Sequence, residues 1–213
     1  MIVYSPLDGD ALTSSIPSNP RHCFLMTRLG KPIPEVVDEI RTAVTNGCRA
    51  FDYQVIDASS KVTGRDFLLK IWKQIASAPL SIGICHEAIP AKTQANIYYE
   101  LGIAQALGKE TLLIKSPGTD IPSDFVRTEY ITFDETFADN FEAFLTSLSE
   151  QADHYELVAD QLDRNPILAI DYLKRAFLIS GDERLRSKAR ELVSDAELIN
   201  RASNSVEMLA AAF

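Results

Sequence analysis

Short apolar runs alternate with longer amphipathic stretches between residues 22 and 149, and this alternation limits the possible folds more than any other feature. The apolar runs have the length of buried strands, and the stretches between them carry apolar residues at helical spacing. Parallel strands joined by helical crossovers produce this pattern, because each crossover returns the chain to the same edge of the sheet. The strands are expected at residues 23–27, 49–57, 80–85, 111–115 and 130–133.

The stretches between the strands predict the helices and their ends. Gly47 and Gly108 stand where the first and third helices are expected to stop, since glycine readily adopts the left-handed conformation of a helix C-cap. The sequence therefore predicts an α/β fold with a five-stranded parallel sheet, flavodoxin-like or Rossmann-like, and helices on both faces. The helices are expected at residues 34–47, 64–78, 96–110 and from residue 137 onward.

The pattern divides the chain into three parts. Residues 1–21 are expected to form an irregular N-terminal lead-in, residues 22–150 the sheet domain, and residues 151–213 an all-helical C-terminal region. Asn165, before a proline, is typical of a helix start, and Ser194 predicts a capping box before a last helix. About 60 residues make a poor independent core. These helices are therefore expected to pack on the sheet domain or, as we favour, to form a homo-oligomer.

Composition excludes several classes of function. The net charge of −9 argues against a nucleic-acid partner, and no apolar run approaches the roughly 20 residues that cross a bilayer. The first ten residues lack the pattern of a signal peptide. The odd, widely spaced cysteines and the scattered histidines favour a reducing cytoplasmic setting with neither disulfides nor a metal site.

One acidic residue stands alone in the third expected helix. Glu100 is the only charged residue between Thr93 and Gly108, and it lies at the edge of an apolar stripe. Burying an unpaired carboxylate is costly and raises its pKa. Glu100 therefore pairs with a basic residue at the sheet edge, faces solvent, or serves in the crevice at the strand ends. Gly102 is expected to admit another backbone closely.

This segment carries a resemblance to a known family. NIYYELGIAQALGKETLLI, residues 96–114, resembles a stretch of the TIR-like and nucleoside 2-deoxyribosyltransferase-like superfamily, with CFLMTRLGKP and SDFVRTEYITF as further matches. The resemblance covers roughly residues 22–149 and implies a TIR-like nucleotide-binding domain. It implies that Glu100 is catalytic and acts at the glycosidic carbon of a nucleoside, a nucleotide or NAD. It implies no cofactor, because NAD would be a substrate.

Four candidate substrate contacts lie where strands are expected to end. Thr27 and Arg28 follow the first strand and could meet a phosphate, although Arg28 also fits a surface loop. Asp57 ends the second strand, where it also fits a turn cap. His86 follows the third strand, where relatives often carry an aspartate, and it could substitute as a hydrogen-bond partner or have no special role.

Three further candidates lie on the third expected helix. Asn96 is either a cap at the helix start or a substrate contact. Tyr98 and Tyr99 could stack on a base, and one of them is expected to serve packing instead. Glu100 itself is expected in the first half of the helix, beside a cleft at the ends of the first three strands.

Three interpretations of the function follow. The first is an enzyme, an N-glycosidic bond hydrolase or transferase such as an NAD glycohydrolase or a deoxyribosyltransferase-like protein. The second is a non-catalytic nucleotide sensor, favoured by the missing aspartate. The third is an assembly module of TIR-like fold, favoured by the helical tail, and it is compatible with the first.

Overall fold

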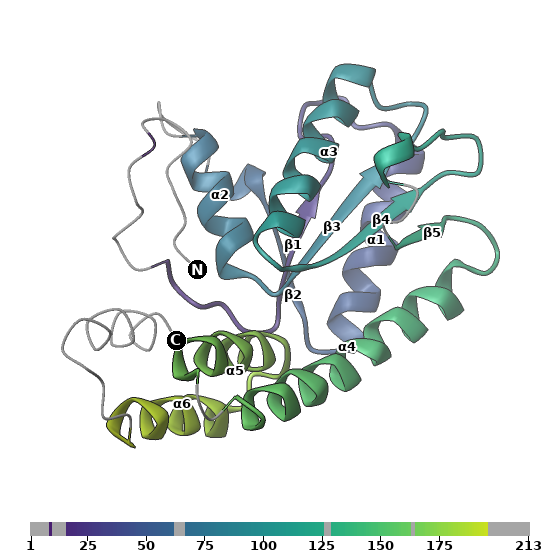
Figure 1. Ribbon diagram of the computed structural model, residues 1–213. Coiled ribbons are helices and arrows are strands. Elements are labelled where there is room, and N and C mark those ends of the chain that lie inside the picture. The colour runs from purple at the N-terminus through teal and green to yellow at the C-terminus, as the bar shows by residue number, and fades with distance from the viewer. Residues whose placement is uncertain (1–8, 10–15, 62–66, 126–128, 163–164, 196–213) are drawn as a thin grey trace. The chain divides into compact units, whose positions relative to one another are not determined.

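The computed structural model of the protein describes residues 9, 16–61, 67–125, 129–162 and 165–195 (Figure 1). The chain groups into two compact units. One unit is His22–Leu145, and the other combines the described residues of Met1–Arg21 with those of Thr146–Phe213. Each unit has a buried hydrophobic cluster of its own.

A five-stranded sheet forms the centre of the first unit. All neighbouring strands are parallel, and their order is β2-β1-β3-β4-β5. The order reverses between β1 and β3, so the carboxyl ends of these two strands form the crevice typical of such sheets. This arrangement confirms the predicted fold class. The strands are β1 His22–Met26, β2 Gln54–Asp57, β3 Leu80–Cys85, β4 Glu110–Lys115 and β5 Tyr130–Thr132.

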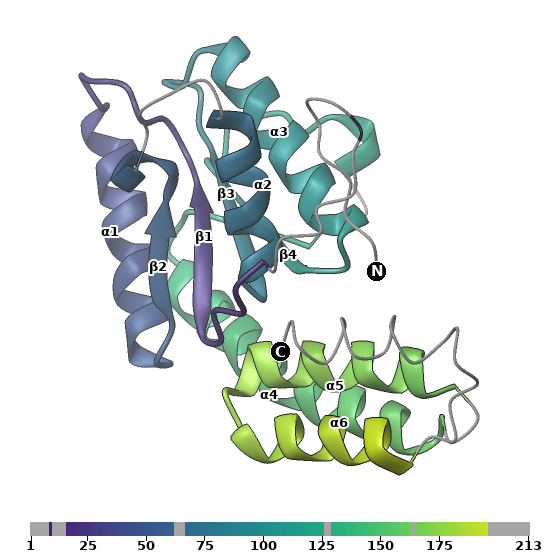
Figure 2. The same cartoon turned by 90° about the vertical axis from the view of Figure 1, so that its left-hand side faces the viewer.

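Helices cover both faces of this sheet (Figure 2). α1 (Glu35–Ala50) lies on one face, while α2 (Phe67–Ser77) and α3 (Ala91–Ala106) lie together on the other. Short 3₁₀ helices follow β2 and β4, at Ala58–Lys61 and Ser123–Phe125.

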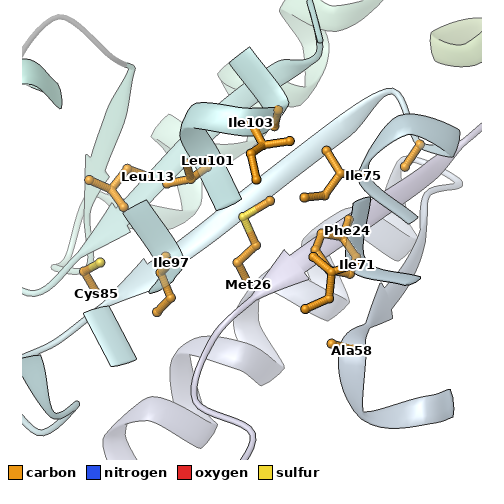
Figure 3. Packing of buried hydrophobic residues seen from close by; sticks show 12 residues of the cluster. Phe24, Met26, Ala58, Ile71, Ile75, Cys85, Ile97, Leu101, Ile103 and Leu113 are labelled. Atoms are coloured by element: carbon orange, nitrogen blue, oxygen red, sulfur yellow. The ribbon is translucent and has the colours of Figure 1, made fainter. Parts of the chain in front are cut away.

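The core between the sheet and the α2–α3 face is built mainly from apolar side chains. Side chains alternate along β1, so Phe24 and Met26 point to this face. They meet Ile71 of α2 together with Ile97 and Leu101 of α3 (Figure 3). These side chains are all almost fully buried, which fixes α3 against the sheet.

The prediction that Gly47 ends the first helix is wrong. α1 continues to Ala50, and β2 is correspondingly shorter than the expected strand 49–57. A Cβ atom at Gly47 would lie 2.7 Å from Cε1 of Phe141, so the glycine admits an aromatic ring against the helix. Sequence alone cannot separate this close approach from a helix end, because both favour glycine.

A second close approach joins α3 to β3. A Cβ atom at Gly83 would lie 2.7 Å from Cδ1 of Leu101 and 2.9 Å from Cγ2 of Ile97. The absence of a side chain at Gly83 therefore lets α3 lie close to the strand. The expectation for Gly102 is wrong, since a Cβ there would meet nothing within 4 Å.

The second unit is helical. Asn165 caps α5, because its Oδ1 accepts a hydrogen bond from Leu168 N at 3.2 Å, as predicted. Ser194 lies near the end of α6, and the last helix predicted after it falls in residues 196–213, outside the described part of the chain. The helices are α4 Phe137–Asp160, which begins in the first unit, α5 Pro166–Ser180 and α6 Glu183–Asp195.

These helices bury a core with one another. Leu173 and Phe177 of α5 and Leu185 of α6 are each at most 2% exposed. Glu156 of α4 accepts hydrogen bonds of 2.6 Å from both terminal nitrogens of Arg184 on α6. The helices therefore cover part of their apolar residues by themselves, and Leu157, Ile167 and Leu168 stay exposed.

Candidate functional site

A cavity of about 170 Å³ lies in the first unit at the carboxyl end of β1. Its walls come from the end of β1 and the loop after it, from the residue after β2, and from α2 and α3. It therefore adjoins the switch point between β1 and β3, where ligands bind in sheets of this order. It is lined by Phe24, Leu25, Met26, Thr27, Leu29, Ala58, Phe67, Thr93, Asn96, Ile97 and Glu100.

Glu100 places a carboxylate in this mostly apolar wall. Its side chain is half-buried, and within the described residues it has neither a hydrogen-bond partner nor an ion-pair partner. Burial raises the pKa of Glu100 from 4.5 to about 7, because the apolar surroundings disfavour the charged form. Of the three alternatives for this residue, the described structure favours the crevice.

The position of Glu100 along its helix differs from the expectation. α3 begins at Ala91, directly after Pro90, so Glu100 lies in the second half of the helix. The helix starts early because proline favours helix entry and because Gln94 Nε2 donates to the carbonyl oxygens of His86 and Ile89, at 3.1 and 2.9 Å. Gln94, His86 and Ile89 all precede residue 96, where the sequence pattern predicted the helix to begin.

Two other predicted contacts share the cavity with Glu100. Thr27 is 7% exposed, and its Oγ1 has no hydrogen-bond partner within the described residues. Asn96 is exposed and lies in the sixth position of α3, so the alternative of a helix-start cap is wrong. Both residues border the cavity, Asn96 with an exposed side chain and Thr27 with an Oγ1 atom that is shielded from solvent.

Arg28 and Asp57 do not line the cavity. Arg28 Nε donates to the carbonyl oxygen of Gly30 at 3.3 Å. Asp57 accepts from Arg41 Nη2 at 3.0 Å and from Ser59 N at 2.9 Å. Asp57 therefore anchors α1 and the turn after β2, because alternation along the strand directs its side chain toward the α1 face.

His86, Tyr98 and Tyr99 also lie outside the cavity wall. Nδ1 of His86 accepts a hydrogen bond from Ala88 N at 2.9 Å, so the imidazole ring is bonded to the backbone of its own loop. Tyr98 packs on Phe125 with ring centroids 5.0 Å apart, and burial raises its pKa. Tyr99 is 52% exposed on the opposite side of the helix backbone from the core.

The loop after β3 directs its carboxylate away from the cavity. Oε2 of Glu87 accepts a hydrogen bond of 2.6 Å from the hydroxyl of Ser116, which follows β4, and this bond lowers the pKa of Glu87. Ser116 and Thr119 are buried with their hydroxyl oxygens 2.5 Å apart. Glu87 therefore connects the loops after β3 and β4 and lies outside the wall of the cavity.

Sequence reasoning missed the apolar part of the site. Leu29 and Phe67 line the cavity and are 37% and 38% exposed, which is high for large apolar side chains. Thr93, in the first turn of α3, adds a hydroxyl group to the wall. One available signal was position, since Phe67 begins a helix that follows a strand end, and first helical turns border the crevice of such sheets.

Two other features of the described residues bear on function: the arrangement of metal-ligating side chains, and the length and apolarity of the helices. Within the described residues, no group of three or more His, Cys, Asp or Glu side chains is arranged to hold a metal ion. None of the described helices is long and apolar enough to cross a membrane.

Comparison with solved structures gives three matching chains. The chain is similar to a solved 2-deoxyribosyltransferase from the psychrotolerant bacterium Bacillus psychrosaccharolyticus, with a TM-score of 0.44 and 16% sequence identity. The match covers 57% of this chain and 90% of the other. No family model and no curated protein matches the chain.

Proposed function

We propose that the chain cleaves or transfers the N-glycosidic bond of a nucleoside, a nucleotide or NAD, with Glu100 as the catalytic residue. The observation that carries the proposal is the unpaired, half-buried carboxylate of Glu100 in a cavity at the β1 end. A protein tolerates such a costly group where it has a use for it, and perturbed acids concentrate at functional sites. The resemblance of residues 96–114 supports the same role.

The chemistry requires a negative group beside the sugar. When the bond between the anomeric carbon and the base nitrogen breaks, its electron pair leaves with the base and the sugar gains oxocarbenium character. The Glu100 carboxylate stabilises this cation or bonds to the anomeric carbon to give a glycosyl intermediate. Water or the nitrogen of a second base then attacks the same carbon, releases the carboxylate and loses its proton.

The apolar walls strengthen this effect. A carboxylate that is poorly solvated interacts strongly with a cation that develops next to it. The raised pKa of Glu100 has the same origin, namely the burial of the carboxyl group. Activity is therefore expected to increase as the pH rises through about 7, the pKa at which the carboxylate ionises in the free protein.

The test is a nucleoside turnover assay with a matched control. The parent chain is incubated with 2′-deoxyadenosine, with or without hypoxanthine as acceptor, and separately with NAD, and products are resolved by chromatography. Glu100→Gln keeps the shape and loses the charge, so turnover is expected to fall about 10²–10³-fold. Glu39→Gln changes an exposed residue of α1 and is expected to leave turnover unchanged. Equal turnover by a folded Glu100→Gln variant would place the chemistry elsewhere.

A second candidate function is nucleotide binding without turnover. Within the described residues, Glu100 is the one ionisable side chain that lines the cavity. The carboxylate of Glu87 accepts a hydrogen bond from Ser116 and lies outside the wall. Among the described residues the cavity wall offers no second carboxylate that would activate water or an acceptor, which favours binding without turnover. Calorimetric binding of a nucleoside together with unchanged ligand after long incubation would favour this alternative.

A further inference from the structure

Thr27 has an unusual combination of burial and chemistry. It follows β1, it is 7% exposed, and its Oγ1 is shielded from solvent without a hydrogen-bond partner within the described residues. Leaving a buried hydroxyl unpaired costs free energy that a valine of the same shape would not cost. The fold alone therefore gives no reason for a threonine at this position.

The surroundings of Thr27 suggest a reason. Thr27 lines the same cavity as Glu100, whose carboxylate also has no partner within the described residues. The side chains of Phe24, Leu25 and Met26, which come before it on β1, supply only apolar surface. Two unpaired oxygen-bearing groups in one cavity are both satisfied by a ligand that carries hydroxyl groups.

We infer that Thr27 is a specificity-determining residue whose hydroxyl forms a hydrogen bond with one hydroxyl of the ligand's sugar ring. Threonine carries its hydroxyl and methyl groups on one carbon. A change of χ1 to another staggered rotamer therefore turns the shielded Oγ1 atom to a different direction. A sugar hydroxyl is both donor and acceptor, and it completes the bonding of Thr27 in either sense. This inference rests on the proposed function, and it adds the part of the ligand that the cavity selects.

The inference predicts opposite effects on stability and on binding. Thr27→Val removes the hydroxyl and keeps the shape, so the melting temperature without ligand is expected to stay the same or to rise. Its dissociation constant for adenosine is expected to increase about 2- to 12-fold, the usual range for one neutral hydrogen bond. Thr27→Ser keeps the hydroxyl and is the matched control, expected to bind adenosine as the parent does.

A cycle of protein and ligand variants identifies the bonded hydroxyl. Calorimetry compares adenosine with its 2′-deoxy, 3′-deoxy and 5′-deoxy forms, in the Glu100→Gln background so that the ligand is not consumed. The effect of Thr27→Val is expected to disappear for the one analogue that lacks the bonded hydroxyl and to persist for the other two. Chromatography of the recovered ligand shows separately whether turnover has stopped.

Three outcomes would overturn the inference. A Thr27→Val effect that is absent, or equal for all three analogues, rules out a bond to a sugar hydroxyl. A fall in the melting temperature of Thr27→Val shows that the hydroxyl has a structural partner. In either case turnover that depends on Glu100 leaves the proposed function standing, whereas a chain that neither binds nor turns over a nucleoside, a nucleotide or NAD refutes both.

Discussion

The burial of Glu100 predicts a specific dependence of stability on pH. Its pKa is raised from 4.5 to about 7 by burial. A pKa higher in the folded than in the unfolded chain means that the folded protein holds the proton more tightly. This contribution to stability is therefore present in full below about pH 4.5 and is lost as the pH rises through about 7. The shift corresponds to about 2–3 kcal/mol after allowance for partial exposure.

Glu100→Gln removes the ionisation and should remove this loss. The free energy of unfolding of the variant, relative to the parent, is expected to increase by about 2–3 kcal/mol between pH 4 and pH 8. Other titrating groups are common to both proteins and cancel in the difference. The variant expected to lose activity is thus also expected to be the more stable protein at pH 8.

Urea unfolding at a series of pH values measures this difference. The sequence contains one tryptophan, and Trp72 of α2 packs against the core of the first unit, so its fluorescence reports on that unit. Glu39→Gln, on the exposed side of α1, should show no such trend. A stability difference that is constant from pH 4 to pH 8 would show that the carboxylate is not desolvated. A less stable Glu100→Gln at pH 8 would show that the carboxylate has a cationic partner.

Four further predictions concern packing, the cavity rim, an ion pair and assembly. Gly83→Ala should lower the free energy of unfolding by about 1–3 kcal/mol through overpacking, whereas Gly102→Ala, with open space around its Cβ, should raise it by about 0.5–1 kcal/mol; urea unfolding compares them. Phe67→Leu should weaken binding of free adenine by about 2- to 10-fold by calorimetry, because an aromatic platform is lost, while Phe67→Tyr should not. Glu156→Gln should destabilise the chain by about 0.5–1 kcal/mol at pH 7, and the difference should vanish as the pH falls through about 2, the lowered pKa of Glu156. Self-association through the C-terminal helices predicts a multiple of the chain mass by light scattering and a lower mass for Leu157→Glu, whose parent side chain is 57% exposed; a monomeric parent would refute it.

The strands and the helices between them could be predicted because their signals are local. The amphipathic stretch of residues 67–77 and the apolar run of residues 80–85 after it can each be recognised from their own residues. Helix ends were less predictable, since Gly47 has the composition of a terminator but the role of a contact surface for Phe141. That distinction depends on a ring that lies about ninety positions further along the chain, and no local pattern contains it.

The candidate site was predictable in its acid and not in its walls. Glu100 stood out because a single charge in an apolar stretch demands an explanation. Leu29 and Phe67 did not stand out, because an apolar side chain at a cavity rim has the same sequence signature as one in the core. Asp57 and His86 lay near strand ends as expected, but nearby donors, Arg41 and a backbone amide, already bind their polar atoms. Proximity to a strand end is thus insufficient to identify a ligand contact.

Glu100 and Thr27, the two residues that best mark the cavity, each carry a polar group that has no partner within the described residues. Ionised Glu100 and the hydroxyl of Thr27 each make the protein without ligand less stable than an isosteric variant. A ligand whose hydroxyl group bonds to Thr27, and whose sugar develops positive charge beside Glu100, offsets both losses of stability. Selection for folding alone would favour valine in place of Thr27 and glutamine in place of Glu100. Two residues of one cavity that both lower the stability of the protein, and whose effect a ligand reverses, therefore distinguish a binding site from a packing defect.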